Sequence, residues 1–309
     1  MDARQKKRCE YRKKPMGYYH LSSDGWKDGL LFHTRKEYAM AMTAIALVSL
    51  QYNVQIYVFE LMPNHFHLVL SATGATCIKV FAFIIRRISK QLVQDGYPPL
   101  PKGYDFTLTD ITDQESFKTH FIYAARNPYE KGLCIPGGYV WGSDYLLFTQ
   151  WGEYLHGKRA DEMSKRELCR MTQSRIEIPG HWEILPTLGI LPKNFIAVEK
   201  VRELIPAVKP YLTQCVKDYE SFVHIARELK EDVEYSDSEM KDLAKQLIDQ
   251  HHPGKRLFDL SPEERCKLAV LLNDRFGADA DHIAKALYIS KKVVLQTLRS
   301  KDFGVRKRK

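Results

Sequence analysis

Apolar and polar residues alternate along two neighbouring segments, residues 53–60 and 65–71, and this alternation predicts two β-strands. The segment Met62-Pro63-Asn64 lies between them and suits a turn, because proline fixes its own backbone and asparagine tolerates tight bends. Successive side chains of a strand point to opposite faces, so His65 and His67 share one face and their apolar neighbours share the other. This arrangement suits two ligands of one metal ion, although two histidines on a half-exposed strand have the same spacing.

The first half contains further predicted strands and helices. In chain order, the first half has a strand at 18–23, a helix at 34–51, the two strands described above, a helix at 75–94, a strand at 104–109 and a closing helix. Thr34 and Glu37 have the spacing of a capping box at the start of the first helix. The order strand–helix–strand–strand–helix–strand predicts an α+β fold, in which helices cover an antiparallel sheet.

The closing helix has recognisable ends and a buried side. Thr112 is a natural N-cap, and Glu115 three residues later predicts a capping box. Phe117 and Phe121 are four residues apart, which predicts that they form the buried side of the helix. Pro128 is expected to end the helix.

Tyr123 and Asn127 are also four residues apart on this helix, so they share a face. If that face opposes His65 and His67, Asn127 can supply an oxygen ligand while Tyr123 presents its phenol to the metal. His120 lies near one turn earlier, where it could orient a substrate, but we expect it to be exposed.

These two motifs resemble those of a known family. The segment Met62–Val69 resembles the His-hydrophobic-His motif of the HUH transposases that use a single tyrosine, most closely the REP-associated tyrosine transposases. That family has a second motif, a helix with a tyrosine that runs into Asn-Pro, and Phe121–Pro128 matches it. The segment Tyr139–Tyr145 resembles the family's Trp-Ser-Ser-Tyr tail, whereas Lys102–Thr107 departs from the stretch usual before the helix. The resemblance covers roughly residues 17–150.

The resemblance implies a ferredoxin-like palm with the histidines on a central strand. It implies that Tyr123 attacks single-stranded DNA, held in a hairpin-bearing repeat, and leaves a 5′-phosphotyrosine and a free 3′-hydroxyl that can later rejoin strands. A phenol titrates near pH 10 and needs a phosphodiester polarised by a cation. The ligands His65, His67 and Asn127 form a mixed nitrogen and oxygen set, which suits Mg²⁺ or Mn²⁺. Members of the family act as dimers or as monomers, so a homodimer is one expectation.

Composition agrees with a nucleic-acid partner. The chain of 309 residues has a net charge of +9 and a pI near 9.1, which favours an anionic partner. Its six cysteines are far apart, without a Cys-x-x-Cys pair, so neither a zinc knuckle nor a disulfide framework is indicated. No segment suits a membrane span. These features indicate a cytoplasmic, nucleoid-associated protein. Residues 1–16 are expected to form a mobile basic arm that lies along phosphates or only aids solubility.

The second half predicts two further regions. Residues 151–255 are interpreted as a mainly helical connector, and residues 256–309 as a helix-turn-helix-like DNA-binding module. A capping box at Ser261-Pro262-Glu263-Glu264 begins that module, and Val293 is among its expected core residues. Three-helix units that bind only protein share this pattern.

Several basic and polar side chains are candidates for DNA contacts. On the helix at 75–94 the cationic residues either decorate a solvated face or contact phosphates, and on the last helix they would face a DNA groove or backbone. The candidates are Arg86, Arg87, Lys90, Lys291, Lys292, Gln296 and Arg299.

Three functions are therefore considered. The sequence favours a transposase-type endonuclease and strand transferase. The first alternative is a domesticated protein that binds repeat DNA without cleavage. The second is a rolling-circle-type initiator nuclease, which more often has a histidine triplet and a helicase portion, neither of which is evident here.

Overall fold

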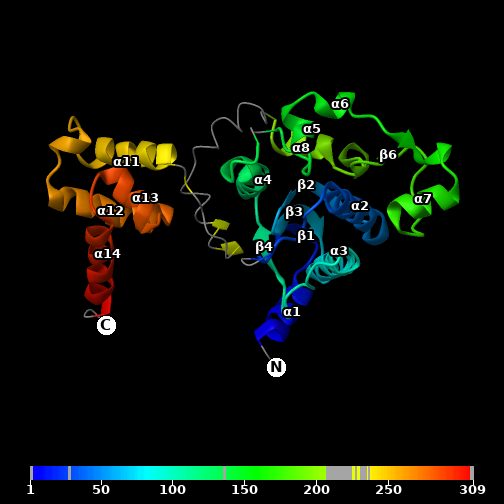
Figure 1. The fold of residues 1–309 in the computed structure, drawn as a ribbon, viewed down its shortest axis with the longest axis horizontal. Coiled ribbons are helices and arrows are strands. Elements are labelled where there is room, and N and C mark those ends of the chain that lie inside the picture. The colour runs from blue at the N-terminus through cyan, green and yellow to red at the C-terminus, as the bar shows by residue number, and fades with distance from the viewer. Residues whose placement is uncertain are drawn as a thin grey trace. The chain divides into compact units, whose positions relative to one another are not determined.

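The computed structural model describes residues 3–26, 29–134, 137–206, 225–226, 228–229, 235 and 237–306, with only the backbone of 238 and 300–306. The described residues divide into two compact units, one formed by residues up to 206 with residues 228–229, and the other by residues 225–226, 235 and 237–306 (Figure 1). No helix of the described residues has both the length and the apolar character that a bilayer span requires.

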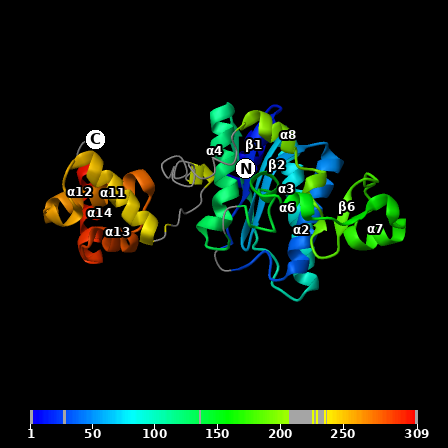
Figure 2. The same ribbon diagram turned by 90° about the horizontal axis from the view of Figure 1, so that it is seen from above.

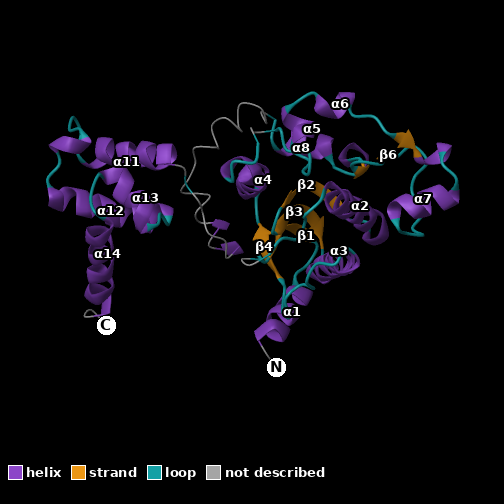
Figure 3. Cartoon of the chain, viewed as in Figure 1, coloured by secondary structure: helices purple, strands orange, loops and turns teal. Residues whose placement is uncertain are grey.

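The first unit is built on a four-stranded antiparallel sheet with the strand order β2-β3-β1-β4. Its strands are β1 (Gly17–Ser23), β2 (Gln55–Met62), β3 (His65–Ala72) and β4 (Phe106–Ile111), shown as orange arrows in Figure 3. The helices α2 (Arg35–Tyr52) and α3 (Gly74–Gln94) follow β1 and β3 in the chain. The order β-α-β-β-α-β is that of the ferredoxin-like unit, and the prediction of an α+β fold is confirmed.

Helices cover both faces of this sheet. Figures 1 and 2 show α4 (Gln114–Glu130) on one face and α2 and α3 on the other. The buried side chains Phe66, Leu68 and Leu70 of β3 belong to the apolar core that also includes residues of α2 and α3. Thr34 caps α2 through a capping box with Glu37, as predicted.

The ends of α4 differ from the prediction. The N-cap is Asp113, whose side chain accepts a hydrogen bond from the Ser116 amide, and Thr112 donates its hydroxyl to Asp113 instead of capping the helix. A carboxylate is a strong cap and also suits the positive helix N-terminus, which explains why it replaces the neighbouring hydroxyl. Pro128 lies inside the last turn, and the helix continues to Glu130. Phe117 and Phe121 are buried, as predicted.

The basic N-terminal segment forms a docked helix, α1 (Ala3–Lys13), so the expectation of a mobile arm is wrong. Arg8 forms an ion pair with Asp105, and its guanidinium lies 4.6 Å from the centre of the Phe106 ring. Tyr11 is buried, and its hydroxyl accepts a hydrogen bond of 3.0 Å from the Leu108 amide of β4. These contacts hold α1 on the edge of the sheet.

Residues 141–144 run along the opposite edge, beside β2. The Leu61 amide donates to the Trp141 carbonyl oxygen at 3.1 Å, and the Ser143 amide donates to the Phe59 carbonyl oxygen at 3.0 Å. A Cβ atom at Gly142 would overlap with the carboxylate of buried Glu60, so any larger residue at this crossing would have to displace that side chain. The segment satisfies the backbone of an edge strand that would otherwise be open.

Residues 145–206 add small elements around the sheet. They are the helices α5 (Tyr145–Phe148), α6 (Trp151–Tyr154), α7 (Lys165–Thr172) and α8 (Val198–Leu204), the 3₁₀ turns η1 (Ala160–Glu162) and η2 (Pro192–Asn194), and the strands β5 (Lys158–Arg159), β6 (Glu183–Leu185) and β7 (Gly189–Ile190). The three strands form a second sheet that the sequence analysis did not predict. Residues 207–224, 227, 230–234 and 236 of the expected connector lie outside the described residues.

The second unit consists of helices around one apolar core. They are α11 (Asp237–His251), α12 (Pro262–Phe276), α13 (Ala280–Leu287) and α14 (Lys291–Arg306), with the 3₁₀ turn η3 (Leu257–Asp259) before α12. The capping box of Ser261 is present. Val293 was predicted to be a core residue, but it is 38% exposed. Its neighbour Val294 is the residue that is buried at the start of α14. The helix α11, which the sequence analysis assigned to the connector, shares this core.

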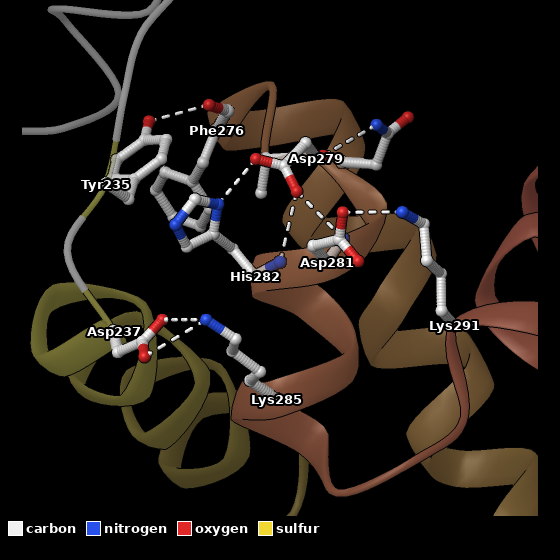
Figure 4. Close-up of polar contacts among 10 residues, drawn as sticks. Tyr235, Asp237, Phe276, Asp279, Asp281, His282, Lys285 and Lys291 are labelled. Carbon is white, nitrogen blue, oxygen red and sulfur yellow. Dashed lines mark hydrogen bonds and ion pairs between the residues drawn. The ribbon is translucent and has the colours of Figure 1, made fainter.

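Polar contacts join the helices of this unit (Figure 4). The Lys285 ammonium lies 3.1 Å from the Asp237 carboxylate, and the Lys291 ammonium lies 2.6 Å from that of Asp281. The Tyr235 hydroxyl donates to the Phe276 carbonyl oxygen at 2.6 Å. Exposed ion pairs add little stability each, so the apolar core is the main source of stability here.

Candidate functional site

The strand β3 positions the two predicted histidines at the centre of the sheet. It pairs with β2 on one side and with β1 on the other, with His67 opposite Glu60 and Ser22. His67 is fully buried and His65 is 8% exposed. Their Nε2 atoms lie 3.0 Å apart. The two imidazoles therefore lie side by side, as the alternation of the strand predicts.

Two further histidines extend this pair. The Nε2 atom of His20 on β1 lies 3.1 Å from Nδ1 of His67, and Nδ1 of His20 lies 3.0 Å from Nδ1 of His120 on α4. His20 was not among the predicted site residues. Alternation along the first strand places it on the same face as Ser22, and the pairing register of β1 with β3 brings it beside His67. The expectation that His120 is exposed is wrong: it is 4% exposed, because α4 turns this side toward the sheet.

The helix α4 brings Tyr123 and Asn127 to the same place. The centre of the Tyr123 ring lies 5.8 Å from that of His67 and 6.0 Å from that of His20. Asn127 donates from Nδ2 to the Tyr123 carbonyl oxygen at 3.0 Å, and its side chain also hydrogen-bonds His67. Both side chains are nearly fully buried, at 3% and 4% exposure. The four residues singled out in the sequence thus converge from one strand and one helix.

Burial makes the central imidazoles poor bases. It lowers the pKa of His67 to about 3, although the hydrogen bond with Asn127 acts in the opposite direction. Burial also lowers the pKa of His20 well below its usual value, and His67 and His120 beside it contribute. Both rings are therefore neutral at neutral pH, and a neutral imidazole has a lone pair that can bind a cation.

The spacing of His65 and His67 fits a shared cation. Two nitrogen ligands at about 2.1 Å from one ion and at right angles to each other are roughly 3.0 Å apart, and this is the separation of the two Nε2 atoms. No group of three or more His, Cys, Asp or Glu side chains within the described residues could hold a metal ion. The Asn127 amide, a side chain of another type, is adjacent to His67.

The candidate DNA contacts have varied surroundings. Arg86 and Lys90 are exposed on α3, but the Arg87 guanidinium donates to the carbonyl oxygens of Thr172 and Gln173. Arg87 therefore packs against the C-terminus of α7 instead of facing open solvent.

On α14, Lys292, Gln296 and Arg299 are exposed, and Lys291 pairs with Asp281. The two groups of candidates belong to different units. Contact of any of these residues with DNA stays a prediction.

No protein-family model matches the chain, and no curated protein matches it. A solved structure described as "Structure of the REP associates tyrosine transposase bound to a REP hairpin" is similar to part of it, with 18% sequence identity over 40% of this chain and 73% of that one. The TM-score is 0.33. A likeness of this size does not establish a shared fold.

Proposed function

We propose that this chain cleaves and rejoins single-stranded DNA in a cation-dependent reaction, as an HUH-type tyrosine transposase. The observation that supports this most is the convergence of Tyr123 with two strand imidazoles, at a ring-centre distance of 5.8 Å from His67. A nucleophile next to a candidate cation site is the arrangement that phosphodiester transfer needs. The net charge of +9 is consistent with a DNA partner.

In this proposal His65 and His67 hold a divalent cation, Mg²⁺ or Mn²⁺, with the amide oxygen of Asn127. When bound, the cation polarises the scissile phosphodiester and neutralises charge on its oxygens. His20 holds the His67 ring through the contact of 3.1 Å at Nδ1, which leaves Nε2 directed at His65. His120 holds His20 in turn, at 3.0 Å.

Tyr123 is the proposed nucleophile. Its phenolic oxygen forms a bond to phosphorus while the bond from phosphorus to the 3′-oxygen breaks. The phenolic proton is lost and the 3′-oxygen gains a proton, so the products are a 5′-phosphotyrosine and a free 3′-hydroxyl. Attack of a 3′-hydroxyl on the same linkage reverses the step and joins strands. Tyr123 is 3% exposed, so its side chain or the residues that cover it must move before a strand can reach it.

This burial favours a second candidate function, DNA binding without cleavage. A covalent-attachment assay distinguishes the strand transferase from the DNA-binding protein. The protein is incubated with hairpin-bearing single strands from the DNA flanking the coding region, in the presence of Mn²⁺ or of EDTA. The strands are labelled at the 3′ end, because the segment downstream of the cleavage point stays on the enzyme. Denaturing gels then detect labelled protein.

The transferase predicts an adduct that needs Mn²⁺ and disappears in Tyr123→Phe. Tyr129→Phe is the matched control, since Tyr129 lies on the same helix and is 37% exposed. Tight binding of a strand without any adduct supports the binding protein. An adduct that persists in Tyr123→Phe contradicts the proposed nucleophile.

A further inference from the structure

A cavity of about 410 Å³ lies in the first unit among α2, α3, the C-terminal end of α7 and the turn between β6 and β7. None of its lining residues belongs to the imidazole and tyrosine site described above. Its volume is within the range of roughly 300–1,000 Å³ typical of small-molecule sites. The cavity is therefore large enough for a ligand of nucleotide size.

The walls of the cavity are cationic. Arg35, Lys36, Arg87 and Arg170 line it, and its lining includes no aspartate or glutamate. Lys36 has a counter-charge, because its ammonium lies 3.2 Å from the carboxylate of Asp95. Among the described residues no carboxylate pairs with the other three. The cavity therefore carries an excess of positive charge, which favours an anion.

Arg87 is the most constrained of these cations. Its terminal nitrogens donate to the carbonyl oxygens of Thr172 and Gln173, and its buried Nε has no hydrogen-bond partner among the described atoms. Burial lowers the pKa of Arg87, and no neighbouring carboxylate opposes this effect. Carbonyl dipoles solvate the guanidinium without neutralising it, so an anion in the cavity would supply the missing counter-charge.

The remaining surface of the cavity is mainly apolar. Met40 and Met171 line it, together with Ile184 and Leu185 of β6. Methionine side chains adapt to flat rings and make favourable contacts with aromatic faces. Cationic and apolar walls in one cavity match a ligand that has both a phosphate and a ring.

The wall formed by the β6–β7 turn is held firmly. Gly189 has a φ of +79°, and a Cβ atom there would overlap with Thr43 and with the backbone of Ala39. The Ile190 amide donates to the Thr43 hydroxyl at 3.4 Å. The turn therefore packs directly on α2, which keeps this side of the cavity in place.

We propose that this cavity binds a nucleotide, with its phosphate at the arginines and its base against Met40 and Met171. The nucleotide is either free in solution or part of a single DNA strand. The proposal does not depend on strand cleavage, because Tyr123 and its neighbouring histidines take no part in the cavity.

Photochemical attachment tests the proposal. The full-length protein is irradiated with 8-azido-2′-deoxyadenosine 5′-monophosphate, or with a five-nucleotide strand that contains one 8-azidoadenine, and the modified peptides are mapped by mass spectrometry. The test variants are Arg170→Glu and Arg35→Glu, which change exposed residues at the cavity. The matched control is Arg166→Glu, an exposed arginine of α7 outside the cavity lining.

We expect attachment to peptides that contain Met40 or Met171. The probe concentration at half-saturation should be about tenfold higher in each test variant, as expected when a charge-assisted hydrogen bond is lost. The same concentration should be unchanged in Arg166→Glu. Attachment of the mononucleotide identifies a free nucleotide as ligand, whereas attachment of the strand alone identifies a nucleotide within DNA. If neither probe attaches to the cavity, or if attachment is the same in all variants, the proposal is wrong.

Discussion

Two carboxyl groups, Glu60 and Asp144, are buried where residues 142–144 cross β2. Asp144 accepts a hydrogen bond from the Gly137 amide at 3.0 Å through Oδ2, while its buried Oδ1 has no hydrogen-bond partner among the described atoms. Burial raises the pKa of Asp144 to about 7. Burial, and the neighbouring Asp144, raise the pKa of Glu60 well above its usual value. Both carboxyl groups therefore bind a proton more tightly in the folded protein than in the unfolded chain.

A raised pKa makes stability depend on pH. The contribution of Asp144 is fully present below its unfolded pKa of 3.8 and is lost as the pH rises through about 7. Each unit of pKa corresponds to about 1.4 kcal/mol, so the whole loss is roughly 4 kcal/mol, and roughly 2.5 kcal/mol of it occurs between pH 5 and pH 8. Glu60 acts in the same direction. We expect Asp144→Asn to lose less stability over this range than the wild type, by about 2 kcal/mol.

Urea unfolding at pH 5 and pH 8 measures this difference. Tryptophan fluorescence reports on the first unit, because all four tryptophans of the chain lie there. Glu177→Gln is the control, since Glu177 is exposed in the same unit. Equal losses of unfolding free energy in Asp144→Asn and in the wild type would refute the reasoning.

Three other predictions concern the site and its helix. The variant His20→Phe removes the hydrogen bond to His67 and should weaken Mn²⁺ binding about 10- to 100-fold in calorimetric titrations. An unchanged affinity would show that His20 does not orient His67. Asp113→Ala should lower the unfolding free energy more than Thr112→Ala does, because Asp113 is the N-cap. The reverse order in urea titrations would contradict Asp113 as the cap of α4. Phe121→Ala should lower the unfolding free energy by about 3–5 kcal/mol, because the side chain is fully buried. A loss below 1 kcal/mol would mean that this side of α4 is not buried.

Features that depend on residues a few positions apart could be predicted from the sequence. The capping boxes at Thr34 and Ser261 are present because each depends only on the cap and the residue three positions later. The alternation around His65 and His67 placed both rings on one face, because strand geometry has a period of two. These local signals were sufficient for the main strands and for the spacing of the imidazoles.

Features that depend on partners far along the chain could not be predicted in this way. The burial of His120 depends on His20, which is 100 positions away. The docking of α1 depends on Asp105, 97 positions from Arg8, and a run of basic residues alone does not reveal such a partner. The buried residue of α14 is Val294 because the helix packs on α12 and α13, and its neighbour Val293 has the same local propensity.

The most direct test of the proposed function identifies the residue that carries DNA after the reaction. Adduct formed with Mn²⁺ is digested with nuclease and trypsin, and the peptides are sequenced by mass spectrometry. Cleavage after Lys118 and Arg126 releases residues 119–126, in which Tyr123 is the single tyrosine. We predict a nucleotide phosphate on Tyr123 of this peptide. A nucleotide phosphate on any other residue, with this peptide unmodified, would contradict the account.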